Sequence, residues 1–379
     1  MYYVDFDNLG FKVSRFGMGC MRLPMIEGHT DDSQVDEKAA IDMIRYAIDH
    51  GVNYIDTAYP YHGGRSEVIV GKALKKGYRD KTMVATKLPI WLAKKYEDFE
   101  KLLDEQLSRL KVDYIDFYLL HALDEKRWHR VRELGVLDFL EKTVQKGKIR
   151  YPGFSFHDEL PVFKDILDSY DWRMCQIQLN ILDEHYQAGV EGLKYAGSKG
   201  IPVVIMEPLK GGKLAQNLSQ EIIDIWNDFP IKRSPVEWAF RWLYNFPEVT
   251  TILSGVSTME QLKENIKIFE NAKPNVMTPE ELALVKRVQE YYKGKIKVDC
   301  TGCNYCMPCP SNVAIPDIFS MYNNASIFDD FKTYKKRYEE FIKKGKDGSQ
   351  CVECGNCESV CPQHLPIIEK IKEAHRALT

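Results

Sequence analysis

Asp56, Tyr61, Lys87 and His121 are four ionisable side chains at or just beyond the ends of three short apolar segments. A phenol with an ordinary pKa of about 10 is a poor acid at neutral pH. An adjacent ammonium group stabilises the phenolate, and a carboxylate behind the ammonium keeps it charged and in place. An imidazole can hydrogen-bond the substrate oxygen and orient it. These residue types therefore suit the reduction of a carbonyl group.

Each of these four side chains also has a structural interpretation. Asp56 could cap a helix, Tyr61 could be a loop aromatic, Lys87 could extend to solvent, and His121 could be a core histidine. Any one of them alone favours the structural interpretation. Because all four fall at matching strand ends, together they favour one shared site.

The elements that must position these residues follow a regular rhythm. Most short β-type segments begin about 25 to 35 residues apart with helical patterns between them, the length of a βα unit. The eight expected strands are 15–20, 52–56, 82–87, 114–121, 149–155, 174–180, 202–207 and 249–254. Eight βα units predict an α/β fold, a (β/α)8 TIM barrel with its active site at the carboxyl ends of the strands. Segment 2–14, with Asn8, Leu9 and Gly10, is expected to form a hairpin that closes the bottom of the barrel.

Eight of the ten cysteines lie in two runs near the end of the chain. The second run, from Cys351 to Cys361, reads Cys-x2-Cys-x2-Cys-x3-Cys-Pro, the pattern of bacterial [4Fe–4S] ferredoxins. The first run, from Cys300 to Cys309, has two residues in place of three at its last spacing. In two-cluster ferredoxins the fourth cysteine of a run ligates the other cluster. We therefore expect two sets of ligands: Cys300, Cys303, Cys306 and Cys361 for one cluster, and Cys309, Cys351, Cys354 and Cys357 for the other.

Alternatives to this ligand assignment stay open. Structural zinc is the weaker one, because zinc sites usually draw two Cys-x2-Cys pairs from separated knuckles. The shortened spacing leaves open whether Cys309 crosses to the other cluster. About 40 residues separate the two runs, which is longer than the separation in a compact ferredoxin. A charged helix is expected within this stretch, over 328–344. The expected domains are a barrel over 1–293 and a small α-helical, ferredoxin-like iron–sulfur domain over 294–379.

Composition excludes several classes of protein. The 379 residues are 44% hydrophobic, and 52 basic against 55 acidic residues give a net charge of −3. This balance argues against a nucleic-acid binder and against a basic membrane-surface protein. The first residues show no basic and apolar leader, and no apolar run is long enough to span a bilayer. We expect a cytoplasmic enzyme.

The motifs around the four ionisable residues resemble the signatures of the aldo-keto reductase superfamily. They read Asp56-Thr-Ala-Tyr-Pro-Tyr61, Ala-Thr-Lys87 and Leu-Leu-His121, and the resemblance covers about residues 1–290. With the cysteine runs, the chain resembles the ferredoxin-fused members of anaerobic bacteria and archaea. The resemblance implies that NAD(P)H delivers hydride to a small-molecule carbonyl substrate. It also implies that Tyr61 is supported by Lys87 and Asp56, while His121 orients the substrate.

The same resemblance implies which residues hold the nicotinamide cofactor. They are Gly19, Cys20 and Met21 beneath the nicotinamide, Ser155 and Gln176 at its carboxamide, Met206, Glu207, Pro208 and Leu209 at its ring, and Gly255, Ser257, Gln261 and Asn265 at the adenosine.

Three departures from the family pattern concern this cofactor. Ser155 is followed by Phe156 and His157 where the family usually has an asparagine, which affects one carboxamide contact. Met206 stands where the family often stacks a tyrosine. Members selective for NADP usually place an arginine or lysine in the adenosine segment, where charge-assisted pairing holds the 2′-phosphate. Here Thr258 and Gln261 stand there, with only Lys263 nearby, and the choice between NAD and NADP stays open.

The fusion leaves more than one function open. Nicotinamide transfers two electrons as hydride whereas each cluster accepts one, and a flavin normally couples the two. No flavin signature is present in the sequence, but a flavin remains possible. The alternatives are an iron–sulfur oxidoreductase coupled to a flavin, a ferredoxin or a flavoprotein partner, or a redox sensor that binds nicotinamide. Trp91, Trp128 and His157 are candidate walls of the substrate pocket, and both tryptophans could instead pack outside the barrel.

Overall fold

A computed structural model describes residues 1–6, 10–28, 31 and 33–379. They form two compact units. The first, called here the barrel unit, contains Met1–Ala215 and Arg233–Leu282. The second, the cysteine unit, contains Gln216–Lys232 and Ala283–Thr379. This grouping differs from the expected boundary at 293, because the segments 216–232 and 283–293 pack with the cysteine unit.

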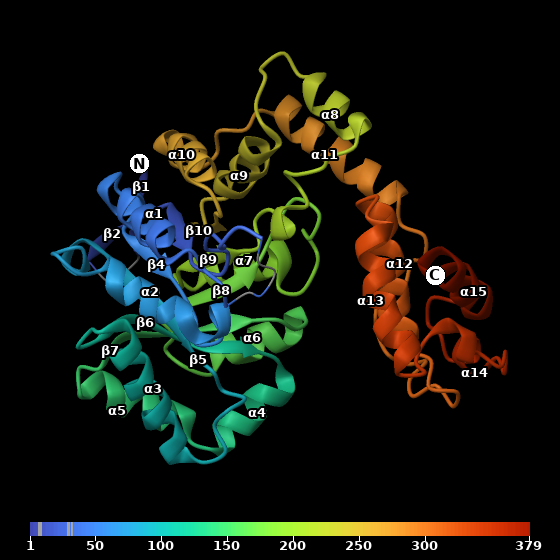
Figure 1. Ribbon diagram of the computed structural model, residues 1–379, viewed down its shortest axis with the longest axis horizontal. Helices are drawn as coiled ribbons and strands as arrows, with labels where there is room; N and C mark the ends of the chain where they lie inside the picture. The colour runs from blue at the N-terminus through green and yellow to red at the C-terminus, as the bar shows by residue number, and fades with distance from the viewer. Residues whose placement is uncertain (7–9, 29–30, 32) are drawn as a thin grey trace. The chain divides into compact units, whose positions relative to one another are not determined.

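The barrel unit contains eight parallel strands closed in the order β10-β3-β4-β5-β6-β7-β8-β9 (Figure 1). They are β3 (Phe16–Gly19), β4 (Tyr54–Asp56), β5 (Met83–Leu88), β6 (Ile115–Leu123), β7 (Ile149–Phe156), β8 (Met174–Gln178), β9 (Val203–Met206) and β10 (Val249–Gly255). The expected TIM barrel is therefore confirmed. Most strand residues are buried, as expected where helices cover a parallel sheet.

Helices connect the strands of the barrel unit. They are α1 (Glu37–Asp49), α2 (Arg65–Ala73), α3 (Tyr96–Leu110), α4 (Glu125–Glu133), α5 (Val136–Gln145), α6 (Leu160–Asp168), α7 (Gly189–Ser198), α9 (Pro235–Asn245) and α10 (Met259–Ile268). In α3, the residues that turn inward, including Phe99, Leu103 and Leu110, recur at helical spacing and are buried. Apart from the buried Gln106, most of the charged residues between them face solvent, which is why this segment folds as a covering helix.

A hairpin of β1 (Tyr3–Phe6) and β2 (Phe11–Ser14) precedes the barrel. The expected turn residues Asn8 and Leu9 lie outside the described residues. The ring of Phe117, near the start of β6, lies 4.9 Å from that of Phe6 and 6.3 Å from that of Phe11. The hairpin thus closes the amino-terminal end of the barrel, opposite the end where active sites form.

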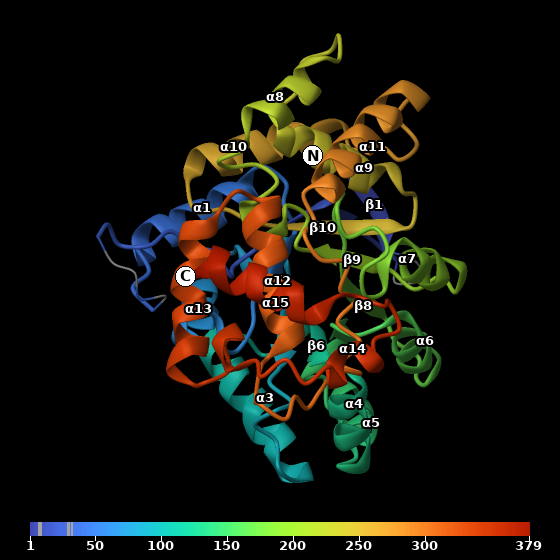
Figure 2. The same cartoon turned by 90° about the vertical axis from the view of Figure 1, so that its right-hand side faces the viewer.

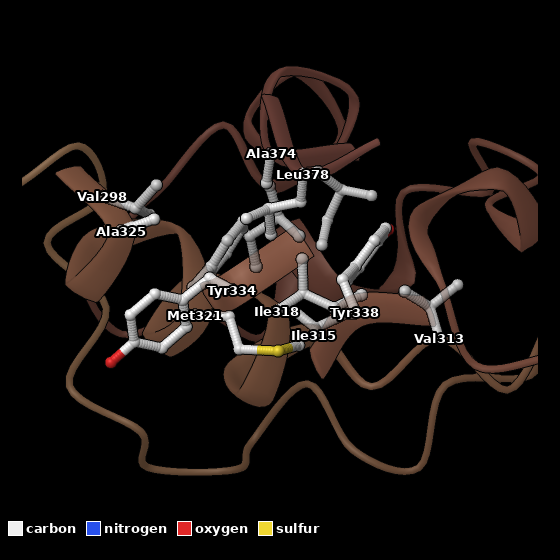
Figure 3. Packing of buried hydrophobic residues seen from close by; sticks show 13 residues of the cluster. Val298, Val313, Ile315, Ile318, Met321, Ala325, Tyr334, Tyr338, Ala374 and Leu378 are labelled. Atoms are coloured by element: carbon white, nitrogen blue, oxygen red, sulfur yellow. The ribbon is translucent and has the colours of Figure 1, made fainter. Parts of the chain in front are cut away.

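The cysteine unit is helical. Its helices are α8 (Gln220–Asn227), most of α11 (Pro279–Gly294), α12 (Ile315–Ile327), α13 (Phe331–Lys343), α14 (Asn356–Ser359) and α15 (Ile367–Leu378). Figure 2 shows α12, α13 and α15 lying together, and Figure 3 shows their shared core of aliphatic side chains and tyrosines. The expected charged helix is shorter than predicted, because Phe328 caps α12 and a new helix starts at Phe331.

Candidate functional site

Asp56, Tyr61 and Lys87 meet at the carboxyl end of the barrel. Lys87 Nζ lies 2.7 Å and 2.8 Å from the two carboxylate oxygens of Asp56 and 3.5 Å from the Tyr61 hydroxyl. The same ammonium group donates to the backbone carbonyl of Thr57 at 2.9 Å. Parallel pairing of β4 with β5 sets this geometry, because Asp56 is in register with Ala85, two residues before Lys87.

His121 faces Tyr61 across this cluster. Their ring centroids are 6.1 Å apart at an interplanar angle of 81°, and Trp91 lies 5.1 Å from the imidazole. The buried Nδ1 of His121 has no hydrogen-bond partner among the described residues. The register of β6 against β7 shifts between Leu120 and Leu123, so the strand is irregular at this histidine. The structure thus brings together all four ionisable residues that the sequence singled out.

Burial dominates the electrostatics of this cluster. It raises the pKa of Tyr61, against the opposing charge of Lys87. The pKa of Asp56 is also raised by burial, and Lys87 opposes that shift as well. Burial works against the charge of Lys87, yet Asp56 and Tyr61 together outweigh it and the lysine pKa is raised. Burial and the nearby Lys87 lower the pKa of His121 well below its ordinary value. These directions favour a protonated Tyr61 phenol, a charged Lys87 and a neutral His121 imidazole at neutral pH.

A second buried network, which the sequence reading missed, supports Lys87 from behind. The Gln106 amide donates to the Lys87 carbonyl at 3.0 Å and to the Glu67 carboxylate at 2.7 Å. Glu67 also accepts from Thr86 at 2.7 Å and pairs with Arg109 at 3.3 Å. Gln106 could have been suspected only as a polar residue on the apolar face of its helix.

Ser155 and Gln176 lie side by side on β7 and β8, where they are paired in register. The Gln176 amide nitrogen lies 3.6 Å from the Met206 sulfur, while its buried oxygen has no partner among the described residues. Ser155 accepts from the Ala122 backbone at 2.8 Å. An unpaired buried amide oxygen is costly, and it fits a ligand that donates a hydrogen bond, as a carboxamide does.

The glycine-containing turn after β3 lies on the other side of the barrel mouth. Gly19 is paired with Gly255 of β10, and a Cβ at Gly19 would make only ordinary van der Waals contact with the Ser254 backbone, at 3.6 Å. Cys20 is buried beside the Asp56–Lys87 pair, and burial raises the pKa of its thiol. Met21 is 55% exposed, so its side chain is free to cover a ligand.

The expected adenosine segment follows β10. The Ser257 hydroxyl donates to the Arg22 carbonyl at 3.0 Å. The side-chain oxygen of Gln261 accepts a hydrogen bond from the Ser257 backbone amide at 2.9 Å. Asn265 donates to Ser254 at 3.1 Å. The ammonium group of Lys263, the lysine nearest to this segment in the sequence, lies over the Tyr46 ring, 5.7 Å from the ring centroid.

The remaining predicted cofactor residues lie in the turn that follows β9. They are Glu207, Pro208 and Leu209, and Gly255 is the last residue of β10.

The structure separates the two tryptophans that the sequence left ambiguous. Trp91 contacts His121 and so lies at the mouth. Trp128 is fully buried on α4, and its ring lies 6.1 Å from that of Trp172. It therefore packs among the outer helices. His157 is partly buried close to the mouth, and burial lowers its pKa.

The cysteines of the second unit surround two neighbouring hollows. One is lined by Cys300, Cys303, Cys306 and Cys361, and the other by Cys309, Cys351, Cys354 and Cys357, with Cys306 reaching both. All ten cysteines of the chain are free thiols. The fourth cysteine of each run thus lies with the first three of the other run.

The arrangement of these thiols bears on the kind of metal site that they could form. Among the described residues, no three histidine, cysteine, aspartate or glutamate side chains converge as one metal ion requires. A [4Fe–4S] cubane binds each thiolate to a different iron, so its ligands lie farther apart than those of one zinc ion. Burial raises the pKa of Cys306 to about 11, so a metal must displace its proton to bind.

Comparison with known families agrees with this arrangement. A sequence profile of the Aldo/keto reductase family matches residues 15–290. The chain belongs to the aldo-keto reductase family. A second profile, described as a 4Fe-4S dicluster domain, matches residues 299–365. This aldo-keto reductase is therefore an NAD(P)-dependent oxidoreductase that carries an iron–sulfur domain.

Individual relatives match about three quarters of this chain and nearly all of their own length. The chain is 28% identical to the NADH-specific methylglyoxal reductase of Escherichia coli over 70% of this chain and 93% of that protein. It is also 28% identical to the L-galactose dehydrogenase of Arabidopsis thaliana over 76% and 93% of the two chains.

Solved structures show the same coverage. Aldo-keto reductase AKR11C1 of Bacillus halodurans, in its holo form, shares 26% identity at a TM-score of 0.63, over 76% of this chain and 96% of its own. An aldo/keto reductase of Klebsiella pneumoniae in complex with NADP and acetate shares 25% sequence identity at a TM-score of 0.59. The match covers 75% of this chain and 94% of that one. Separately, no helix in the described part of the chain is long and apolar enough to cross a membrane.

Proposed function

We propose that this aldo-keto reductase reduces the carbonyl group of a small molecule with NAD(P)H, using Asp56, Tyr61, Lys87 and His121. The observation that carries the proposal is the position of Lys87, whose ammonium group lies between the Asp56 carboxylate and the Tyr61 hydroxyl. This arrangement opens onto a neutral imidazole and the Trp91 ring. Few roles other than acid catalysis need a phenol held in such contacts.

Each side chain has a defined task in this proposal. His121 hydrogen-bonds the substrate oxygen and directs it toward Tyr61. The Tyr61 hydroxyl donates its proton to that oxygen, and the ammonium group of Lys87 stabilises the phenolate that forms. Asp56 keeps Lys87 charged in a buried position where an isolated ammonium would lose its proton. Bound NAD(P)H supplies the hydride.

The cofactor is held, in this proposal, by the residues expected from the family pattern. Gln176 and Ser155 bind the carboxamide, and the unpaired Gln176 oxygen supports that role. The other binding residues are Gly19, Cys20, Met21, Met206, Glu207, Pro208, Leu209, Gly255, Ser257, Gln261 and Asn265.

We further propose that the cysteine unit holds two [4Fe–4S] clusters. The two hollows support the crossed ligand sets, because each contains three cysteines of one run and the fourth of the other. The clusters would exchange single electrons with a ferredoxin or flavoprotein partner. Nothing in the described residues adds support for a flavin in the barrel.

The test compares the wild-type protein with Tyr61→Phe, both purified anaerobically. We expect the wild type to oxidise NADPH or NADH with a small aldehyde, and the variant to be slower by about 10²- to 10⁴-fold. Iron content should be equal in the two proteins. If Tyr61→Phe keeps full turnover, the proposed acid is wrong.

A second measurement asks whether nicotinamide reduces the clusters. NADPH or NADH is added to the wild-type protein without any carbonyl, and reduced clusters are sought by electron paramagnetic resonance. A reduced signal would favour the flavin- or partner-coupled alternative, because hydride cannot pass to one-electron centres directly. Clusters that stay oxidised support a hydride-transfer reductase with a separately reduced iron–sulfur unit.

A further inference from the structure

The two cysteine runs are copies of one structural unit, a relation that the sequence reading did not detect. In each run the residue before the second cysteine and the residue after it have left-handed backbone conformations. These four residues are Gly302, Asn304, Glu353 and Gly355. The third residue after the fourth cysteine, Asn312 in one run and His364 in the other, is also left-handed.

The helices that follow the runs continue the correspondence. Helix α12 begins at Ile315, six residues after Cys309, and α15 begins at Ile367, six residues after Cys361. The ninth residue of α12 is Asn323, and the ninth residue of α15 is His375. These two side chains therefore occupy equivalent positions in the repeat.

Asn323 holds the segment that leads into the first run. Its side-chain oxygen accepts from the backbone amides of Lys297 and Val298 at 3.0 Å and 2.9 Å. Its side-chain nitrogen donates to the Val298 carbonyl at 2.7 Å. All three bonds fall two or three residues before Cys300, the first ligand of that run.

His375 holds the equivalent segment of the second run, with Tyr338 of α13 as an intermediate. The Gly348 amide, three residues before Cys351, donates to the Tyr338 hydroxyl at 2.7 Å. That hydroxyl lies 2.9 Å from His375 Nδ1, so one hydrogen bond joins the tyrosine and the imidazole.

Helix α15 lies unusually close to this segment. A Cβ at Gly348 would meet the His375 Cβ at 2.9 Å and the Ile371 carbonyl at 3.1 Å, so only glycine fits. Asp347, which is 1% exposed, has a carboxylate oxygen 3.7 Å from the same imidazole nitrogen and accepts from the Ser349 amide at 2.9 Å. The close packing of α15 against Gly348 explains why the second run needs a glycine three residues before its first cysteine.

We infer that Asn323 and His375 are equivalent positioning residues. Each fixes the first cysteine of its own run, and so each sets the iron affinity and the reduction potential of one cluster separately. Asn323 acts on the cluster of Cys300, and His375, through Tyr338, acts on the cluster of Cys351. This inference rests on the proposed pair of [4Fe–4S] clusters. Hydrogen-bonded groups beyond the ligands orient those ligands, and their loss typically costs about 10- to 100-fold in metal affinity.

The test uses full-length protein that retains a single cluster. Cys354→Ser removes a ligand of the second cluster, and Cys303→Ser removes one of the first. Both cysteines are exposed, so their removal leaves the helical core intact. Asn323→Ala and His375→Ala are each introduced into both backgrounds, and iron release to a chelator is timed.

We expect a crossed pattern. Asn323→Ala should speed iron release by about 10- to 100-fold in the Cys354→Ser background and leave the Cys303→Ser background unchanged. His375→Ala should do the reverse. The midpoint potential of the remaining cluster, followed by electron paramagnetic resonance, should shift in the matched background alone. His375→Gln keeps a hydrogen-bonding group for Tyr338, since an amide can both donate and accept, and should restore the potential.

Two controls come from the same helices. Asn324 bonds only within its own helix, to Ser320, and Arg376 is exposed. Asn324→Ala and Arg376→Ala should leave both backgrounds unchanged.

The inference is wrong if either test substitution acts equally in both backgrounds, or if neither changes iron release or potential. If one of the Cys→Ser proteins binds no iron, Asn323→Ala and His375→Ala are introduced singly into the wild-type chain instead. There, half of the iron should be released quickly and the other half at the wild-type rate. Release of all the iron at one rate would overturn the inference. A wild-type protein that binds no iron–sulfur cluster would instead overturn the proposed function.

Discussion

The barrel site and the cysteine unit position their reactive groups in opposite ways. In the barrel, Asp56, Lys87 and His121 come from three strands, and side-chain contacts across the chain hold them together. In the cysteine unit, three ligands of each set come from one short run shaped by left-handed backbone turns. The barrel site is therefore built by contacts between distant segments, whereas each proposed cluster site draws most of its ligands from one short segment.

Removing iron tests this contrast most strongly. Anaerobic chelation should abolish the cooperative unfolding transition of the cysteine unit, because binding free energy is folding free energy where ligands hold the loops. The barrel unit should keep its own transition and its affinity for NADPH. Hydrogen exchange, measured separately for peptides from 300–379 and from 83–156, checks this. Rapid exchange in both regions would contradict the contrast.

Breaking the buried ion pair is the next largest effect. Lys87→Met leaves the Asp56 carboxylate, which is 4% exposed, without its cation. We expect a loss of about 3–5 kcal/mol in the free energy of unfolding of the barrel. Denaturant unfolding measures this, with the exposed Lys101→Met as the control. Because burial raises the Asp56 pKa, the variant should recover stability as the pH falls and the carboxyl group becomes protonated. A loss below 1 kcal/mol would show that water relieves the unpaired charge.

A smaller effect is expected at the carboxamide site. Gln176→Leu removes the unpaired buried oxygen that we assign to the cofactor. One lost hydrogen bond corresponds to about a tenfold higher Kd for NADPH. Fluorescence titration measures it, and the exposed Gln145→Leu on α5 serves as the control. An unchanged Kd would remove Gln176 from the cofactor site.

The smallest effect expected is a flat pH profile. Reduction requires Tyr61 to be protonated, and burial raises its pKa, so kcat/KM should fall only above the ordinary tyrosine range. His121 has a pKa well below its ordinary value and stays neutral as the pH passes through 6.5. The rate should therefore show no inflection there. A step near 6.5 would mean that His121 titrates as an ordinary histidine.

How much the sequence could predict depends on how far apart in the sequence the interacting residues lie. The βα rhythm placed Asp56, Lys87 and His121 at strand ends, because the carboxyl ends of parallel strands always meet at one mouth. The cysteine runs were legible because three ligands of each set are close in sequence. Asn323 and His375 were not, since each acts on a segment 25 or more residues away through packing that no short pattern encodes. The tetrad's chemical roles and the cluster ligands stay predictions.

The closure of the barrel has a consequence for how the chain is made. The last strand, β10, pairs with the first, β3, through Ile252 and Phe16, so the sheet closes only after nearly all of the barrel sequence exists. Every cysteine of the two runs lies beyond that closing strand. During synthesis, which releases the amino-terminal part first, the cysteines of the two runs leave the ribosome after the whole barrel sequence. Cluster assembly therefore takes place on a polypeptide whose nicotinamide-binding half can already be folded.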